Sequence, residues 1–260
     1  MKNHKYIKTA LNTIIDDICV EHFSTIGSTN DYLLEREISH KYHFCYAERQ
    51  TKGRGRRGDK WISDNNDNIY STLAFSCNFN ITEDSFISIK VALGVLETIK
   101  KYIPVDRQEK LKIKLPNDIY FEDHKLAGIL IETKNIKKDS FDIVIGIGIN
   151  VNMTNIKEDI DRQWTSLSII NNYEIDSSKV IVDLVRYVIN NFEKSYLDTL
   201  EAFSKYDYTL NRKITFNYSN KNFQGIARGI TDNLMLKILD DNNNLHEFDL
   251  ANISKIRVIK

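Results

Sequence analysis

The spacing of apolar residues predicts two long helices, at Thr82–Ile103 and Val180–Phe192. In the first, apolar side chains recur every three or four residues, at Ile89, Leu93, Leu96, Ile99 and Ile103. This period places them on one face of a helix. A shorter amphipathic helix is predicted between Ile7 and Ile18. Another is predicted to begin at Ser28, where Ser28 and Asp31 form a possible capping box.

Runs of alternating or mostly apolar residues predict strands between these helices. They lie at Val20–Thr25, His43–Arg49, Ile69–Cys77, Leu111–Leu115, Ile119–Phe121, Lys125–Lys134 and Phe141–Asn152. Polar turns join the last three, so we expect successive antiparallel strands there. Helices and strands together predict an α/β fold with a mixed sheet and flanking helices.

The pattern changes after about Asn211. Five short runs follow without helical periodicity, separated by polar turns: Lys213–Tyr218, Phe223–Ile230, Leu234–Leu239, His246–Leu250 and Lys255–Ile259. Such spacing is typical of a small all-β, barrel-like module. We therefore predict two domains, residues 1–210 and residues 211–260.

Composition narrows the functional classes. The chain has 260 residues, and its 36 Lys and Arg residues balance 36 Asp and Glu residues. No overall field therefore draws it to nucleic acid or to a membrane, and an anion site has to be local. The three cysteines are widely spaced without a metal-ligand pattern, which favours free thiols. With neither a signal peptide nor a long apolar span in view, we expect a cytoplasmic protein.

Positive charge is concentrated in Gln50–Trp61, which reads QTKGRGRRGDKW. Glycine frees the backbone, and arginine supplies planar donors for phosphate or carboxylate. We interpret the segment as a mobile loop that closes over an anion. Its match to G-x-G-x-x-G does not indicate a dinucleotide site, because no helical pattern follows. A solvated basic hairpin is the alternative interpretation.

Three further motifs place polar groups at strand ends. Lys114–Asp118 reads KLPND, Lys125–Glu132 reads KLAGILIE, and Gly146–Asn152 reads GIGINVN. A glycine inside a strand permits close approach of a ligand or another backbone. An asparagine amide donates and accepts side by side, as reading a nucleobase edge requires. The alternatives are a simple Pro-Asn-Asp turn and a β-bulge with a solvent-exposed lysine.

These motifs resemble, in order, those of the biotin protein ligases. The resemblance is carried by Ser28–Asn30, Gln50 with GRGRRG and Trp61, KLPND, KLAGIL, GIGIN and Trp164–Leu167, and it extends to Gly225–Ile230. It implies a core like that of class II aminoacyl-tRNA synthetases, followed by an SH3-like β-barrel. It also implies that biotin and ATP form biotinyl-5′-AMP with release of pyrophosphate, after which a lysine of a carrier protein takes the biotinyl group.

The resemblance also implies roles for individual residues. Those expected to bind biotin are Ser28, Thr29, Asn30, Gln50, Gly53, Arg54, Arg56, Lys125 and Gly128. Those expected to bind ATP or the adenylate are Arg56, Arg57, Trp61, Asn117, Lys125, Asn150 and Arg228. Lys125, Arg56 and Asp118 are the expected catalytic residues. Mg²⁺ is expected to accompany ATP, without a dedicated protein metal site.

The implied partner is the biotin carboxyl carrier protein or domain of acetyl-CoA carboxylase or another biotin-dependent carboxylase. The 27 residues before Ser28 predict one helix, so we expect no operator binding and no nucleic-acid partner. A monomer and a homodimer both remain open. The alternative functions are a lipoate or octanoate ligase of the same fold, a non-catalytic biotin-binding module, and a nicotinamide oxidoreductase. Lys125 favours an enzyme, and the arginine-glycine loop with KLAGIL favours biotin.

Overall fold

The computed structural model describes residues 2–63, 68–78, 86–155 and 163–259, without the side chains of residues 57 and 251. A seven-stranded sheet runs in the order β1-β2-β3-β7-β6-β5-β4. Its strands are β1 Ile18–Ile26, β2 Tyr42–Gln50, β3 Ile69–Asn78, β4 Leu111–Lys114, β5 Asp118–Phe121, β6 His124–Lys134 and β7 Ser140–Ile149. β1 and β2 pair in parallel, and the other neighbours pair antiparallel. The predicted mixed sheet is confirmed.

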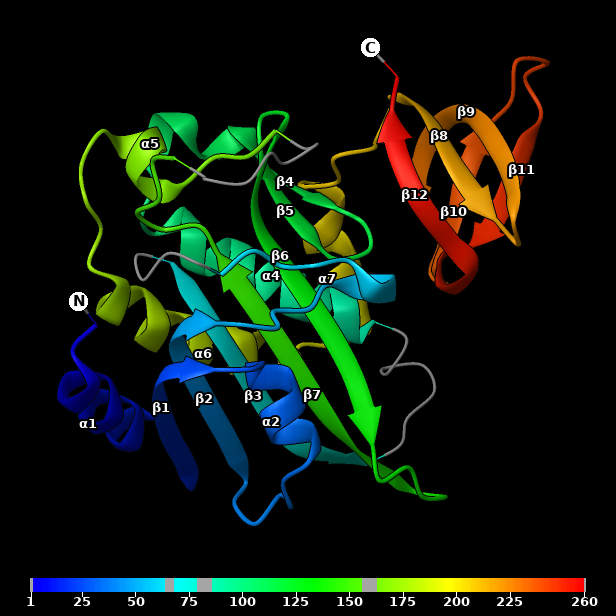
Figure 1. Cartoon of the computed structure of the whole chain (residues 1–260). Coiled ribbons are helices and arrows are strands. Elements are labelled where there is room, and N and C mark those ends of the chain that lie inside the picture. Colours follow the sequence, from blue (N-terminus) through cyan, green and yellow to red (C-terminus); the bar gives the residue numbers. More distant parts are fainter. Residues whose placement is uncertain (1, 64–67, 79–85, 156–162, 260) are drawn as a thin grey trace.

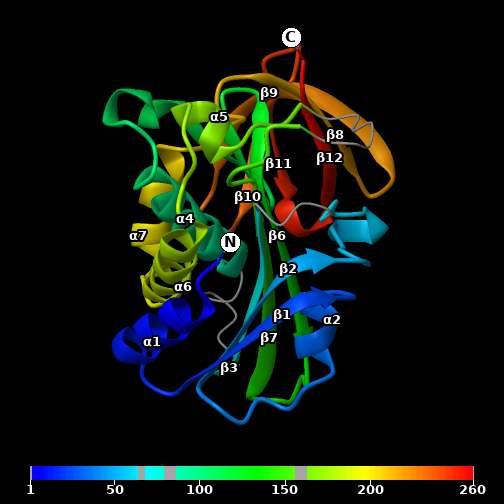
Figure 2. The ribbon, with the colours of Figure 1, turned by 60° about the vertical axis from the view of Figure 1, so that its left-hand side comes forward.

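Helices cover both faces of this sheet. Four of them gather on one face: α1 His4–Ile14, α4 Ile87–Lys100, α6 Ser177–Phe192 and α7 Tyr196–Ser204 (Figures 1 and 2). α2, Thr29–Leu34, lies on the opposite face, and the short α5, Leu167–Asn171, lies near the β4 end (Figures 1 and 2).

α4 is buried because it is apolar around most of its circumference. It contacts α6 on one side and strands β4, β5 and β6 on another, and apolar helices of this kind belong in a core. Gly94 makes the contact with α6 unusually close. A Cβ built on Gly94 would lie 2.7 Å from Val188 Cα and 2.9 Å from the Tyr187 carbonyl oxygen.

The C-terminal strands form a separate sheet in the order β11-β10-β9-β8-β12. They are β8 Lys213–Tyr218, β9 Lys221–Ile230, β10 Met235–Leu239, β11 Leu245–Asp249 and β12 Ile253–Val258. Every pairing is antiparallel. The sheet stands beyond the β4 and β5 end of the large sheet (Figure 1). The predicted all-β module is confirmed.

The element boundaries differ from the sequence predictions in places. The first helix ends at Ile14, because Ile18 already begins β1. The helix predicted from Thr82 is α4, and Thr82 itself lies outside the described residues. α5 and α7 were not predicted. Within the described residues, no helix is long and apolar enough to cross a membrane.

Gly94→Ala tests the close helix contact. Alanine favours a helix interior by about 1 kcal/mol over glycine, but here its Cβ would overlap backbone atoms of α6 that cannot rotate away. Overpacking of this kind costs about 1–3 kcal/mol, so we expect a net loss of stability, measured as a lower midpoint of urea unfolding. Gly27→Ala is the control, because its Cβ would meet no atom within 4 Å. A Gly94→Ala protein at least as stable as the wild type would contradict this packing.

Candidate active site

A cavity of about 1500 Å³ opens between the two sheets. Segments far apart in the sequence line it: the start of α2, the loop after β2, the β5 and β6 strands, the end of β7, and β12. The predicted site residues in its wall are Ser28, Thr29, Asn30, Gln50, Arg54, Arg56, Trp61, Asn117, Asp118, Lys125, Gly128 and Asn150. The structure thus brings most of the predicted site together.

Three predicted site residues do not appear in this wall. The side chain of Arg57 lies outside the described part of the chain. Gly53 is buried where the loop ends meet, with its Cβ position 2.4 Å from the Trp61 carbonyl oxygen. Arg228 is exposed on β9 and donates to Asn211 Oδ1 at 2.7 Å. The second sheet instead lines the cavity with β12 residues such as Lys255 and Arg257.

Buried polar groups line the end of the cavity beside α2. Thr29 donates its backbone N–H to Gln50 Oε1 at 2.8 Å, and its Oγ1 lies 3.0 Å from the same oxygen. Gln50 Nε2 donates to Ser63 Oγ at 3.2 Å. Ser28 caps α2 by accepting from the Asp31 N–H at 3.3 Å, as its sequence position predicted. These bonds hold the polar side chains in place before any ligand arrives.

Glycines on β6 and β7 provide space for two of the protein's own side chains. A Cβ on Gly146 would lie 2.1 Å from Asn30 Oδ1. A Cβ on Gly148 or Gly128 would lie 2.4 Å or 2.6 Å from ring carbons of Trp61. The close approach predicted at these glycines therefore comes from side chains. Trp61 Nε1 is buried and has no hydrogen-bond partner among the described residues, so a ligand oxygen beside it would be well placed to accept.

The segment after β2 is a hairpin whose two ends meet. Trp61 N–H donates to the Gly53 carbonyl at 3.0 Å, and Gly55 N–H donates to the Asp59 carbonyl at 2.7 Å. Arg56–Gly58 forms a single 3-10 turn at the tip. The segment therefore has the shape of a hairpin, but it is not the solvated hairpin of the alternative interpretation, because Arg54 and Arg56 are half-buried and line the cavity.

Arg54 is anchored by two carboxylates. Its Nη1 and Nη2 donate to Glu132 Oε1 and Oε2 at 3.0 and 2.8 Å, and Nη2 also lies 2.6 Å from Asp31 Oδ1. The hydrogen bond to Glu132 is the main cause of the raised pKa of Arg54. Sequence reasoning assigned no role to Glu132, because its partner stands 78 positions away.

Lys125 lies at the centre of the cavity wall. Its Nζ is 2.7 Å from Asp118 Oδ1 and 5.2 Å from the centre of the Trp61 ring. Only 16% of the Lys125 side chain and 13% of the Asp118 side chain are exposed. Water screens such a pair weakly, so the ammonium group is held at one position and remains close to any anion placed above Trp61.

Asn117 and Asn150 support the wall through the backbone. Asn117 Nδ2 donates to the Ile129 carbonyl at 2.8 Å, and Asn150 Nδ2 donates to the Thr165 carbonyl at 3.0 Å. Thr165 N–H in turn donates to the Lys125 carbonyl at 3.0 Å. The two amides therefore fix the strand that carries Lys125.

An aromatic and charged contact in the cavity wall joins the turn between β5 and β6 to the segment that precedes β8. Tyr208 Oη donates to Asp123 Oδ1 at 2.7 Å, and Arg212 Nη2 donates to the same oxygen at 3.1 Å. The Arg212 guanidinium also lies 4.4 Å from the centre of the Tyr208 ring. Burial and the bond to Asp123 raise the pKa of Tyr208. Sequence reasoning missed these residues because they lie outside the recognised motifs.

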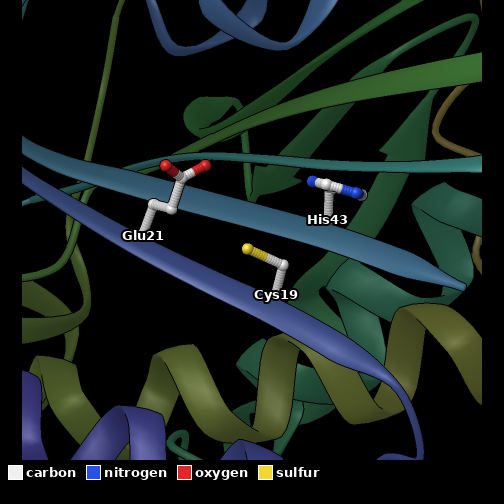
Figure 3. A group of neighbouring side chains, drawn as sticks. All are labelled: Cys19, Glu21 and His43. Atoms are coloured by element: carbon white, nitrogen blue, oxygen red, sulfur yellow. The ribbon is translucent and has the colours of Figure 1, made fainter. Parts of the chain in front are cut away.

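Cys19, Glu21 and His43 come together on β1 and β2, with ligand atoms within 4.8 Å of one another (Figure 3). Their lone pairs have other partners. His43 Nε2 accepts the N–H groups of residues 39 and 40 at 3.0 Å each. Glu21 accepts the Tyr32 hydroxyl at 2.7 Å. Burial raises the pKa of the Cys19 thiol, which disfavours the thiolate that a metal needs. This arrangement is better suited to cross-strand packing than to metal binding.

Comparison with known proteins agrees with the motifs. Residues 23–150 match the profile of the biotin/lipoate A/B protein ligase family. The bifunctional ligase/repressor BirA of Escherichia coli K12 is 33% identical over 221 residues, covering 83% of this chain and 68% of that protein. The biotin–[acetyl-CoA-carboxylase] ligase of Mycobacterium tuberculosis is 32% identical over 164 residues, covering 62% of this chain and 59% of that protein.

A solved structure shows the same fold. The biotin protein ligase from Aquifex aeolicus, in complex with biotin and ATP, superposes with a TM-score of 0.77 at 26% identity. The match covers 94% of this chain and all of that one. The superposition extends over nearly the whole chain, the motifs surround one cavity, and the Escherichia coli relative aligns over 68% of its length. This chain therefore belongs to the biotin protein ligase family.

Proposed function

We propose that the chain activates biotin with ATP to biotinyl-5′-AMP, releasing pyrophosphate, and then transfers biotin to a lysine of a carboxyl carrier protein. The observation that carries this proposal is the position of Lys125, whose ammonium group lies between Asp118 and Trp61 in the cavity wall. The Aquifex aeolicus ligase, which was solved with biotin and ATP, supports the choice of substrates. We also propose residues 1–210 and 211–260 as its two domains.

The polar end beside α2 is the proposed biotin site. Thr29, Asn30 and Gln50 are at most 9% exposed and have defined hydrogen bonds. Such an arrangement suits a ring that carries both N–H and C=O groups. The proposed biotin end also includes Ser28, which caps α2, Gly53 and Arg54 of the hairpin, and Gly128 of β6. Trp61, Asn117 and Asn150 are proposed for the nucleotide end.

The chemical step requires positive charge between the two substrates. Attack of a carboxylate on the α-phosphate of ATP brings negative groups together and forms a more crowded anion. Lys125 and Arg56 are the proposed groups that offset this charge. A well-placed donor of this kind contributes about 3–4 kcal/mol of transition-state stabilisation. Asp118 would hold the Lys125 ammonium in position through their 2.7 Å contact.

ATP would enter as its Mg²⁺ complex. Mg²⁺ in nucleotide sites is commonly held by one or two carboxylates together with substrate phosphates and water. Asp118 is the wall carboxylate proposed for this role, with one oxygen in contact with Lys125 at 2.7 Å, whereas Asp123 is bonded to Tyr208 and Arg212. We also propose that Arg57 and Arg228 contact the phosphates of ATP.

The proposed acceptor is the carrier domain of a biotin-dependent carboxylase. The Mycobacterium tuberculosis relative is named for acetyl-CoA carboxylase as its substrate, which supports this choice. The matching family description also includes lipoate ligases, so lipoate or octanoate transfer is the second candidate. Pyrophosphate release from ATP with biotin, lipoate or octanoate as the acid distinguishes them. Release with lipoate and none with biotin would refute the biotin assignment.

Lys125→Ala should abolish adenylate formation while the fold is kept. Removing the ammonium leaves the developing charge without its nearest cation, so we expect biotin-dependent pyrophosphate release to fall about 10²–10³-fold. Lys213→Ala is the matched control, because Lys213 lies on β8 and pairs with Asp241 at the surface. Adenylation at the wild-type rate in the Lys125→Ala protein would show that its contact with the reacting groups is misassigned.

Arg56→Ala should weaken retention of the adenylate more than binding of biotin. Arg56 lies at the hairpin tip and lines the cavity, where its charge would interact with the phosphate that biotin alone lacks. Calorimetry with biotin, together with the rate at which bound biotinyl-5′-AMP is lost to hydrolysis, measures the two effects separately. Equal losses for both ligands would argue against a closing loop.

A further inference from the structure

We propose that Glu132 is a positioning residue for biotin: its carboxylate sets the direction of a chain of buried hydrogen bonds that ends at the Thr29 hydroxyl in the cavity. This inference rests on the proposed function and adds a specificity determinant to it. Glu132 is not itself among the lining residues of the cavity. It acts through Asn30, which is in the wall.

The carboxylate of Glu132 has two partners. Arg54 binds both of its oxygens, at 3.0 and 2.8 Å, in the bidentate geometry that favours an ionised carboxylate. Asn30 Nδ2 donates to Glu132 Oε2 at 3.0 Å. An ionised carboxylate only accepts hydrogen bonds, so Asn30 has to turn its NH₂ group toward Glu132.

The orientation of the Asn30 amide decides the next two links. With Nδ2 facing Glu132, Asn30 Oδ1 accepts from Thr72 Oγ1 at 2.7 Å. A hydroxyl carries one hydrogen, so Thr72 accepts at its 2.9 Å contact with Thr29 Oγ1. Thr29 therefore receives no hydrogen bond from Thr72, and its own hydroxyl hydrogen has two acceptors within reach, Thr72 Oγ1 at 2.9 Å and Gln50 Oε1 at 3.0 Å. Gln50 Oε1 keeps the Thr29 backbone N–H at 2.8 Å.

The links from Thr72 to Asn30 to Glu132 donate toward the carboxylate, so Thr72 has no hydrogen left to donate to Thr29. The Thr29 oxygen is then left with lone pairs on the cavity side, where it can accept from an N–H of a ligand ring. Gly146 leaves the space for this geometry, since a Cβ there would lie 2.1 Å from Asn30 Oδ1. Asn30 is 4% exposed and Thr72 is fully buried, so no water competes for these bonds.

Asp31 offers a matched comparison. Its carboxylate also contacts Arg54, at 2.6 Å, but no hydrogen bond between its side chain and Asn30 is present in the described structure. Asp31→Asn therefore removes one negative charge from the Arg54 anchor and leaves the hydrogen-bond chain unchanged. Glu132→Gln removes the other charge and one of the two acceptor oxygens that Arg54 and Asn30 share.

Biotin-dependent pyrophosphate release by the full chain tests the proposal. For Glu132→Gln we expect the KM for biotin to rise about tenfold or more, because a buried hydrogen bond to a charged group is lost and the Thr29 hydroxyl turns. The KM for ATP and the kcat at saturating biotin should stay within about twofold. Asp31→Asn should raise the KM for biotin by less than about threefold. If Glu132 served folding alone, the variant would have a lower midpoint of thermal unfolding, and its KM for biotin would change no more than its KM for ATP.

A second variant serves if Glu132→Gln fails to fold. Thr72→Val is nearly isosteric, and Thr72 has no hydrogen bond to Arg54 in the described structure. The variant removes the hydroxyl that links Asn30 to Thr29, so the Thr29 side chain loses a buried partner and the KM for biotin should also rise. An unchanged KM for biotin in the folded variant, or an equal rise in Asp31→Asn, overturns the proposal. Wild-type protein that releases no pyrophosphate with biotin would instead refute the proposed function, which is a separate result.

Discussion

The shape of the cavity depends on glycines in β6 and β7, where the backbone carries no side chain. On β7, Asn30 lies so close to Gly146, and Trp61 so close to Gly148, that a Cβ at either position would overlap them. Trp61 lies similarly close to Gly128 of β6. Two side chains that belong to other elements can therefore lie flat on the sheet. Asn30 fixes the start of α2, and Trp61 fixes the end of the hairpin. One local packing constraint thus positions both the polar end of the cavity and the loop that covers it.

The positive charges of the site are held in place by partner carboxylates. Arg54 is paired with Glu132 and Asp31, and Lys125 is paired with Asp118. The chain has no net charge to attract an anion from a distance, so recognition depends on these local groups. A partly buried ion pair costs desolvation, and its benefit here is a defined geometry. Cations held this way are already oriented when two negatively charged substrates meet.

Much of the fold could be predicted from the sequence, because helix and strand runs follow from short-range pattern, whereas the roles of the site residues came from the resemblance to the biotin protein ligases. The strand runs, the long helices and the capping Ser28 depend on neighbours within a few positions. The parallel pairing of β1 with β2 depends on contacts between strands, which no local pattern records. For the same reason the local motif could not show that the Asn117 side chain also supports β6, by donating to the Ile129 carbonyl. Glu132 was overlooked because its role exists only once Arg54 lies beside it.

The hairpin after β2 connects both ends of the cavity through hydrogen bonds. Gln50, at its first end, bonds Ser63, and Ser63 Oγ donates to the Trp61 carbonyl at 3.2 Å. A change at Gln50 is therefore two hydrogen bonds away from the backbone of Trp61, and a change at Thr29 is three away. If biotin occupies the polar end and the nucleotide the Trp61 end, as we propose, both substrates contact the same short, covalently continuous segment.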